Sequence, residues 1–241
     1  MIACIPSKGR SKTVTYKLFE EVGITALHFI EPQDADSYSA LKTICIGKND
    51  MGVGFARQFI LDWCKANQHQ WVIMCDDDIT AFGDVIDRKC VKKNAGIFFD
   101  ILTTAKKLPF ALYGINFRQY AWSETKNYSI NSKVFTAVTI MNTDLLQHKY
   151  PDTLKEDITF LFEAIRLTPG VMKFNKYWFN TPPVGTNQGG CFDAYQQGEQ
   201  DTMNAILNQY KGYVKVVSKK DRDDIKWDVA KFAADHKRKI V

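Results

Sequence analysis

Short apolar runs alternate with helix-like segments through the first third of this 241-residue chain. Four runs have the length and composition of buried strands: Ile2–Ile5, Ala26–Ile30, Thr43–Ile46 and Trp71–Cys75. Two of the intervening segments carry apolar residues at helical spacing: Thr13–Val22, which ends at Gly23, and Val53–Asn67. Such alternation predicts an α/β fold with a mixed, mostly parallel sheet flanked by helices.

The alternation continues more loosely to the end of the chain. We expect helices at Gly96–Lys107, Glu156–Arg166 and Gln200–Tyr210, and strands at Phe110–Asn116, Phe135–Asn142, Val171–Phe179 and Tyr213–Ser218. Residues 180–198 contain two prolines and four glycines, which predicts a long loop, and a charged tail closes the chain. There is no repeat, linker or break in composition, so we expect residues 1–241 to form one domain.

Composition narrows the class of protein. Hydrophobic residues make up 45% of the chain and charged residues 24%, which is ordinary for a globular domain with a sizeable core. The opening residues read as a first strand, and no apolar run approaches the ~18 residues of a membrane span, so we expect a cytoplasmic protein without a membrane partner. The six cysteines lack metal-site spacing, and we expect Cys4, Cys45 and Cys75 to behave as small hydrophobic residues.

The strongest motif is a run of three carboxylates, Asp76, Asp77 and Asp78, directly after the strand Trp71–Cys75. A strand that ends in carboxylates places them at the carboxyl edge of the sheet, where open α/β folds bind ligands. Neighbouring carboxylates repel one another unless a cation neutralises them, and Mg²⁺ typically binds one or two carboxylates together with substrate phosphates. An acidic helix cap or a solvated turn is the alternative for an isolated motif of this kind.

Three further segments accompany the carboxylates. The loop Pro6–Arg10 follows the first strand with backbone amides, a hydroxyl and two cations that suit a nucleotide. Glu31 follows the second strand, where an acid can accept hydrogen bonds from a ribose or base. The segment Gly52–Arg57 opens a helix with two glycines, and Arg57 is suited either to a diphosphate or to holding the aspartates in place.

These motifs, in this order and with the later Lys155-Glu156-Asp157, resemble the GT-A class of glycosyltransferases. Within that class the chain most resembles the TET-associated glycosyltransferases of tailed phages, over about residues 2–165. The resemblance implies a metal-dependent enzyme that moves a sugar, with a UDP-sugar as donor, onto 5-hydroxymethylcytosine or another hydroxymethylated pyrimidine of phage DNA in the bacterial cytoplasm. It further implies a nucleotide-sugar-binding half (residues 1–110) and an acceptor-binding half (residues 111–241).

The resemblance also assigns roles. It implies that Asp76 and Asp78 bind Mn²⁺ or Mg²⁺, with His236 as a candidate further ligand, and that Asp157, or in second place Glu156, deprotonates the acceptor hydroxyl. The residues implied in binding the nucleotide sugar are Pro6, Ser7, Lys8, Arg10, Glu31, Gly54, Arg57, Asp76 and Asp77. An acidic pair in a first helical turn also stabilises the helix dipole, which is a sufficient structural role for Glu156 and Asp157.

A DNA acceptor needs a contact surface, and aromatic and basic residues are candidates for it. The rings are Tyr120, Trp122, Tyr177 and Trp178, and the nearby cations are Arg118 and Lys126, with a further basic cluster in the last 30 residues. Core packing is the alternative for the rings. For the whole chain three alternatives stay open: a GT-A enzyme acting on a glycan or protein, a nucleotidyltransferase, and a non-catalytic binding module.

Overall fold

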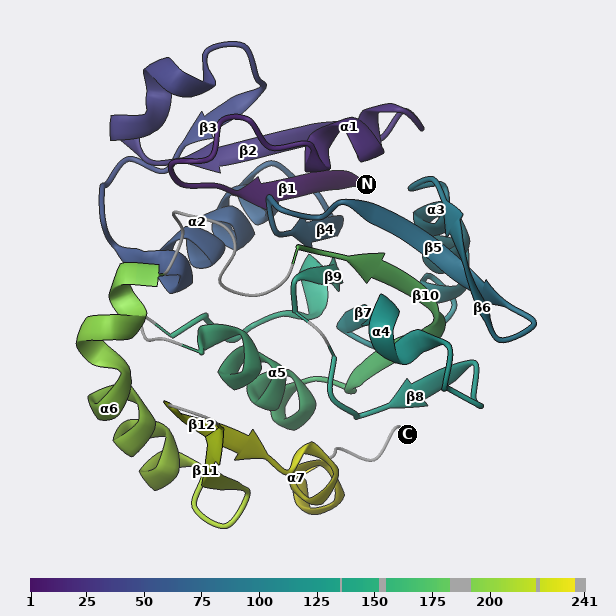
Figure 1. Ribbon diagram of the computed structural model, residues 1–241, viewed down its shortest axis with the longest axis vertical. Helices are drawn as coiled ribbons and strands as arrows, with labels where there is room; N and C mark the ends of the chain where they lie inside the picture. Colours follow the sequence, from purple (N-terminus) through teal and green to yellow (C-terminus); the bar gives the residue numbers. More distant parts are fainter. Residues whose placement is uncertain (135, 152–154, 183–191, 220–221, 237–241) are drawn as a thin grey trace.

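A computed structural model of the protein describes residues 1–134, 136–151, 155–182, 192–219 and 222–236. Within these residues a ten-stranded mixed sheet runs through the molecule, in the order β3-β2-β1-β4-β9-β7-β10-β5-β6, with β8 paired to β10. Helices cover both faces of this sheet (Figure 1). The predicted α/β class is confirmed.

The strands that position the site share one direction. They are β1 (Ile2–Pro6), β2 (Ala26–Ile30), β3 (Thr43–Cys45), β4 (Trp71–Cys75), β7 (Leu112–Phe117) and β10 (Val171–Asn180). β9 (Val138–Asn142) lies antiparallel between β4 and β7. Because β9 reverses direction relative to both neighbours, β4 and β7 end at the same edge of the sheet.

Three strands of the main sheet were not expected from the sequence. β5 (Ala81–Ile86) and β6 (Lys89–Lys93) form a hairpin at the edge of the sheet, and β8 (Tyr128–Ile130) pairs with β10. The hairpin turn has two non-glycine residues with positive φ, Asp87 at 50° and Arg88 at 61°. A two-residue turn of this kind usually contains glycine or asparagine, so the sequence gives little sign of it.

The helices divide between the two faces. α1 (Thr15–Glu20) and α3 (Ile97–Ala105) pack on one face through a buried cluster that includes Phe19 and Phe98. The other face is covered by α2 (Gly52–Ala66), α5 (Glu156–Leu167), α6 (Phe192–Gln209) and α7 (Val229–His236). α6 begins at Phe192, so the helix starts earlier than expected, and the chain after it continues as β11 (Val214–Lys219), β12 (Arg222–Trp227) and α7.

Short elements complete the described chain: η1 (Pro32–Tyr38), α4 (Arg118–Ala121) and η2 (Thr143–Leu145).

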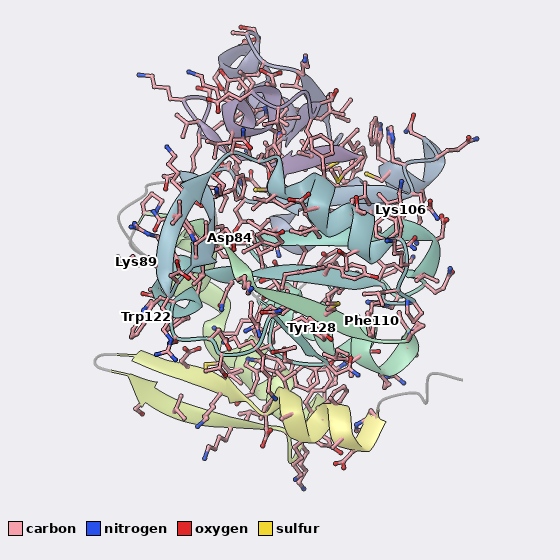
Figure 2. All side chains as sticks on the ribbon, turned by 90° about the vertical axis from the view of Figure 1, so that its right-hand side faces the viewer. Asp84, Lys89, Lys106, Phe110, Trp122 and Tyr128 are labelled. Carbon is pink, nitrogen blue, oxygen red and sulfur yellow. The ribbon has the colours of Figure 1, made fainter. Side chains whose placement is uncertain are left out.

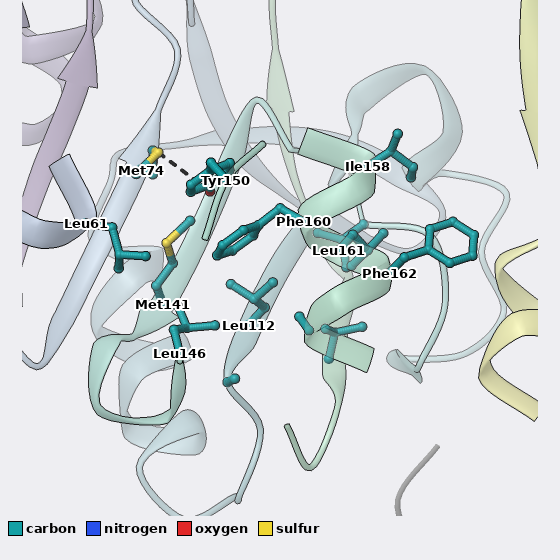
Figure 3. Close-up of a cluster of buried hydrophobic side chains, with 14 of the residues drawn as sticks. Leu61, Met74, Leu112, Met141, Leu146, Tyr150, Ile158, Phe160, Leu161 and Phe162 are labelled. Carbon is teal, nitrogen blue, oxygen red and sulfur yellow. Dashed lines mark hydrogen bonds between the residues drawn. The ribbon is translucent and has the colours of Figure 1, made fainter. Parts of the chain in front are cut away.

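The side chains of β4 alternate between the two buried clusters, with Val72 and Met74 on the α2 side and Ile73 on the α1 side. On the α2 side the rings of Tyr150 and Phe160 stack with centroids 3.8 Å apart (Figure 3). Both faces of β4 are therefore buried, which fixes the point where the strand ends and the three aspartates begin.

The cysteines follow the expectation in part. The five described cysteines are free, and Cys4, Cys64 and Cys75 are buried. Cys45 is exposed at the end of β3, so the prediction that it packs as a small hydrophobic residue is wrong, because β3 is an edge strand. Among the helices of the described residues, none is both long and apolar enough to cross a membrane.

Candidate functional site

The three aspartates lie where the sequence places them, immediately after β4 at the carboxyl edge of the sheet. The backbone amide of Asp76 donates to the carbonyl of Ala137 at 2.8 Å, which extends the pairing of β4 with β9 by one residue. Asp77 is buried, whereas Asp76 and Asp78 are half-buried. The end of the strand therefore presents two accessible carboxylates, those of Asp76 and Asp78, with the buried Asp77 between them.

The loop after β1 holds the buried carboxylate. Ser7 donates to Asp77 Oδ2 at 2.6 Å, and Arg10 donates to Asp77 Oδ1 at 2.9 Å. Thr13 donates to the Asp77 carbonyl. Burial raises the pKa of Asp77, and the hydrogen bonds from Ser7 and Arg10 oppose that rise. Since both carboxylate oxygens already accept hydrogen bonds, Asp77 fixes the loop.

Tyr38 supports this loop from η1. Its hydroxyl lies 2.6 Å from Ser7 Oγ and accepts a hydrogen bond from the backbone amide of Arg10 at 2.8 Å. Arg10 also approaches Asp78 Oδ2 at 3.7 Å. The guanidinium group of Arg10 thus lies beside two of the three carboxylates.

Arg57 joins the aspartates to a second acidic pair. Its side chain is only 8% exposed, and it contacts Asp76 Oδ1 at 2.9 Å and Glu156 Oε1 at 3.1 Å. Burial raises the pKa of Asp76 to about 7. The positive charge of Arg57 lowers this pKa, and the neighbouring carboxylates raise it further. Burial likewise raises the pKa of Glu156 to about 6 against the attraction of Arg57. Of the two roles open to Arg57, the contacts favour holding the carboxylates.

Asp157 and Glu156 begin α5 but differ in their surroundings. Glu156 is buried and paired with Arg57, whereas Asp157 is half-buried and its Oδ2 accepts a hydrogen bond from Thr136. Lys155, just before the helix, has a left-handed backbone (φ 60°) and pairs with Asp224 at 3.2 Å. The start of α5 therefore leaves Asp157 as the more accessible carboxylate of the pair.

The acid after β2 forms its own cluster. Glu31 is buried, and its Oε2 lies 3.1 Å from Lys8 Nζ and accepts a hydrogen bond from Gln33 at 2.5 Å. Lys8 also pairs with the exposed Asp50, and Gln33 reaches the same carboxylate at 3.3 Å. Glu31 is thus held in place next to the loop that follows β1.

Two predicted residues contribute only backbone or space. Pro6 is the last residue of β1, and Gly54 lies buried in the first turn of α2. The preceding Gly52 has a φ of 84°, a conformation that favours glycine, and α2 begins there. Pro6 thus belongs to β1, whereas Gly54 belongs to α2, the helix that also contributes Arg57.

The carboxylate oxygens at this edge of the sheet suit a divalent cation that also contacts phosphate. Within the described ranges no three His, Cys, Asp or Glu side chains are grouped to bind a metal ion. Asp76 and Asp78 supply carboxylate oxygens, and Mg²⁺ commonly takes one or two carboxylates and completes its coordination with phosphate oxygens and water. The raised pKa of Asp76 also indicates that this position favours an additional positive charge.

His236 lies elsewhere. It ends α7, where its ring stacks on Phe232 with centroids 4.3 Å apart and its Nδ1 lies 3.0 Å from the Phe232 carbonyl oxygen. α7 packs against α5 on the side away from β1 (Figure 1). We therefore leave His236 out of the metal site proposed below.

Several residues of the site carry no signal of their own in the sequence. Hydrogen bonds or ion pairs that span between two and 64 positions in the chain connect five of them to the site: Thr13, Gln33, Tyr38, Asp50 and Thr136. Hydroxyl and amide groups of this kind are common on any surface, and only the folded arrangement selects them. Tyr38 is the partial exception, because an aromatic residue in the polar segment that follows β2 is unusual.

Solved structures share the fold of this chain. Glucosyl-3-phosphoglycerate synthase from Mycobacterium tuberculosis, in complex with Mn²⁺, UDP and glucosyl-3-phosphoglycerate, aligns with a TM-score of 0.54 at 10% identity. The alignment covers 93% of this chain and 86% of that one. A second complex of the same synthase, with Mn²⁺, UDP-glucose and phosphoglyceric acid, has a TM-score of 0.53 at 10% identity over 93% and 85% of the two chains. These likenesses show that the chain has the fold of the GT-A glycosyltransferases.

Sequence comparison gives the family within that class. The model of the TET-associated glycosyltransferase family matches residues 1–181. The chain belongs to the TET-associated glycosyltransferase family, and the resemblance stated from its motifs is confirmed. No curated protein matches the chain in sequence. All of the site residues except His236 fall within the matched segment.

Proposed function

We propose that this glycosyltransferase moves a sugar from a UDP-sugar onto the hydroxymethyl oxygen of 5-hydroxymethylcytosine, or a related hydroxymethylated pyrimidine, in phage DNA. The observation that carries the proposal is the arrangement around Arg57. It brings the carboxylates at the end of β4 and those at the start of α5 together at one edge of the sheet. The carboxylates at the end of β4 suit binding of the sugar donor through a metal ion, and those at the start of α5 suit deprotonation of the acceptor hydroxyl.

On the donor side, Asp76 and Asp78 would hold Mn²⁺ or Mg²⁺. A cation there offsets the negative charge of the departing nucleoside diphosphate. The similar synthase from M. tuberculosis was solved with Mn²⁺ and UDP, which supports the same choice of donor and metal here. Arg10 lies beside Asp78 and adds a fixed positive charge at this edge.

The nucleoside would lie along the loop after β1 and the end of β2. This site would be lined by Pro6, Ser7 and Lys8. Glu31, which lies 3.1 Å from Lys8, would accept hydrogen bonds from the ribose or base. We assign Gly54, in the first turn of α2, to the same site. The nucleotide-sugar site would then belong to the half formed by residues 1–110.

On the acceptor side, Asp157 is the proposed general base. The acceptor hydroxyl oxygen forms a bond to the anomeric carbon while the bond from that carbon to the diphosphate oxygen breaks, and the hydroxyl proton moves to Asp157. Thr136 holds one oxygen of Asp157 by hydrogen bonding and so orients the other. Glu156 is committed to Arg57 and is the weaker candidate. The general base of the acceptor site would belong to the half formed by residues 111–241.

A base inside a duplex must leave the stack to reach a site at the edge of the sheet, so the proposal includes extrusion of the target nucleotide. This step is easier for single-stranded or mismatched DNA, because less pairing and stacking energy is lost. Turnover should accordingly be faster on a hydroxymethylated base opposite a mismatch than on the same base in a matched duplex.

The test is a UDP-release assay with several UDP-sugars, Mn²⁺ or Mg²⁺, and DNA with or without 5-hydroxymethylcytosine. Release that needs both metal and hydroxymethylated DNA supports the proposal. Slow hydrolysis that is indifferent to DNA contradicts the acceptor and points to a glycan or protein. Release of pyrophosphate identifies a nucleotidyltransferase instead, and the absence of both UDP binding and release favours a binding module. The Asp78→Asn variant should lose metal-dependent release. Its control is Lys106→Gln, at an exposed lysine directly after α3.

A further inference from the structure

The β5–β6 hairpin carries a group of exposed cations. Arg88, Lys89, Lys92 and Lys93 are all exposed, and within the described chain none of them forms an ion pair or side-chain hydrogen bond. The hairpin contains two acids, one of them the turn residue Asp87. A cluster of unpaired cations on one element is the electrostatic pattern that phosphate groups recognise.

Exposed aromatic rings lie in the segment between β7 and β10. Trp122 is 55% exposed and Tyr128 is 54% exposed. The indole nitrogen of Trp122 donates to the carbonyl of Gln119 at 3.0 Å, so the orientation of its ring is fixed within its own turn. By contrast Trp178 is 2% exposed and Tyr177 half-buried, so the expectation that Trp178 lines an open surface is wrong: it packs inside the sheet.

The cations and the ring of Trp122 belong to one surface. The thiol of Cys90 on β6 lies 3.6 Å from the carbonyl oxygen of Arg118, the first residue of α4, which ties the hairpin to the segment that carries Trp122. Arg118 also stacks over the ring of Trp178 at 5.4 Å. Figure 2 shows Lys89 and Trp122 at the same margin of the molecule, with Lys106 at the opposite one.

We call this surface the β6–α4 strip; it is formed by Arg88, Lys89, Lys92, Lys93 and Trp122. The strip begins beside the candidate active site. β5 starts at Ala81, three residues after Asp78, and its second residue, Phe82, pairs with Lys93 on β6. Four extended residues span at most about 14 Å, so Lys93 lies within about 20 Å of the carboxylates once the strand spacing is added. A nucleic acid that lies along the strip therefore reaches the edge of the sheet where Asp78 and Asp157 are found.

We propose that the β6–α4 strip is the DNA-binding surface of this enzyme, with phosphates against Lys89, Lys92 and Lys93 and a base against the ring of Trp122. The inference rests on the proposed DNA acceptor and deepens it. Lysines on an edge strand also prevent pairing with other sheets, and that role alone explains the cations. It does not explain the exposed ring of Trp122 beside them, whereas cations next to an aromatic face are what a strand of nucleic acid binds.

The test compares two double variants that remove equal charge. Lys89→Gln/Lys93→Gln removes two cations from the strip, and Lys106→Gln/Lys107→Gln removes two exposed cations at the end of α3. Binding of a fluorescein-labelled duplex containing 5-hydroxymethylcytosine is followed by anisotropy at several salt concentrations. UDP affinity and the melting temperature of each variant show that the donor site and the fold are intact.

We expect the strip variant to bind DNA at least tenfold more weakly near 0.1 M salt, with the slope of log K against log salt reduced by about 2. The control variant should stay within about twofold of the unmodified protein, because its cations face away from the strip. Trp122→Ala should weaken binding at least about fivefold with little change in salt slope, because it removes stacking and leaves the charge unchanged.

The outcomes separate the two proposals. If the unmodified protein binds and glycosylates DNA but both double variants weaken binding equally, the strip is refuted and the proposed function stands. If DNA binds through the strip and no UDP is released, the strip stands and the proposed function fails. If UDP binds and DNA does not, both the acceptor and the strip are wrong.

Discussion

Replacing Arg57 by methionine tests how the site is held together. Arg57 is the only residue described here that contacts both Asp76 and Glu156, and its side chain is 8% exposed. Methionine has similar length and no charge, so the change removes both ion pairs while keeping most of the packing. The variant leaves Glu156, whose side chain is 6% exposed, as a buried carboxylate with no cation.

The expected loss follows from that burial. Breaking a buried ion pair by removing one partner costs about 3–5 kcal/mol. The contact with Asp76 adds at most about 1 kcal/mol, because that side chain is 36% exposed and partly screened by water. We therefore expect Arg57→Met to lower the free energy of unfolding by about 3–6 kcal/mol at pH 8. The double variant Arg57→Met/Glu156→Gln should recover about 2 kcal/mol, because no charge is then left uncompensated.

The pH dependence gives a second check on the same reasoning. The pKa of Glu156 is already raised to about 6, above the ~4.3 of an unfolded chain, and removal of Arg57 raises it further. An acid whose folded pKa is raised adds stability at low pH and loses it as pH rises through that value. The deficit of Arg57→Met should therefore be smaller at pH 5 than at pH 8. Urea denaturation at the two pH values measures it, and an equal deficit at both, or no recovery in the double variant, refutes the argument.

Three further predictions concern other parts of the molecule. Asp157→Asn should lower turnover by about 10²–10⁴-fold with UDP affinity unchanged, and Thr136→Val should lower it less, which steady-state kinetics and calorimetry will measure. Burial lowers the pKa of His28 to about 4, so its contribution to stability is complete above pH 6.5 and is lost as pH falls toward 4; about 2 kcal/mol should be lost by pH 5, and His28→Phe should flatten that part of the profile. A Cβ on Gly83 would lie 2.1 Å from Trp178, so Gly83→Ala should destabilise the fold by about 1–3 kcal/mol in a denaturant titration.

The sequence predicts the first half of the fold closely because its strands are apolar and bounded by turn residues. β1, β2 and β4 lie within one residue of their expected limits. The β5–β6 hairpin was missed because β6 carries three lysines and its turn lacks glycine. A strand at the edge of a sheet has one solvated side, so its pattern resembles that of a polar loop.

The candidate site divides along similar lines. The carboxylates and Arg57 stand out in sequence because charged residues directly after an apolar strand, or at the start of a helix, need a reason to be there. Their partners do not stand out. Ser7 and Asp77 are 70 positions apart, and Thr136 and Asp157 are 21 apart, so only the folded structure shows that each hydroxyl holds a carboxylate.

The sharing of one guanidinium group by two carboxylates has a thermodynamic consequence. A cation that binds Asp76 competes with Arg57 for that carboxylate and leaves the guanidinium group more fully available to Glu156 at the start of α5. Binding of the donor is then thermodynamically linked to ordering of the first residues of α5, where Asp157 lies. Linkage is reciprocal: an acceptor that favours the ordered α5 start must raise the affinity for metal and donor by the same factor. Cooperative uptake of the two substrates is thus a property expected from this single buried arginine.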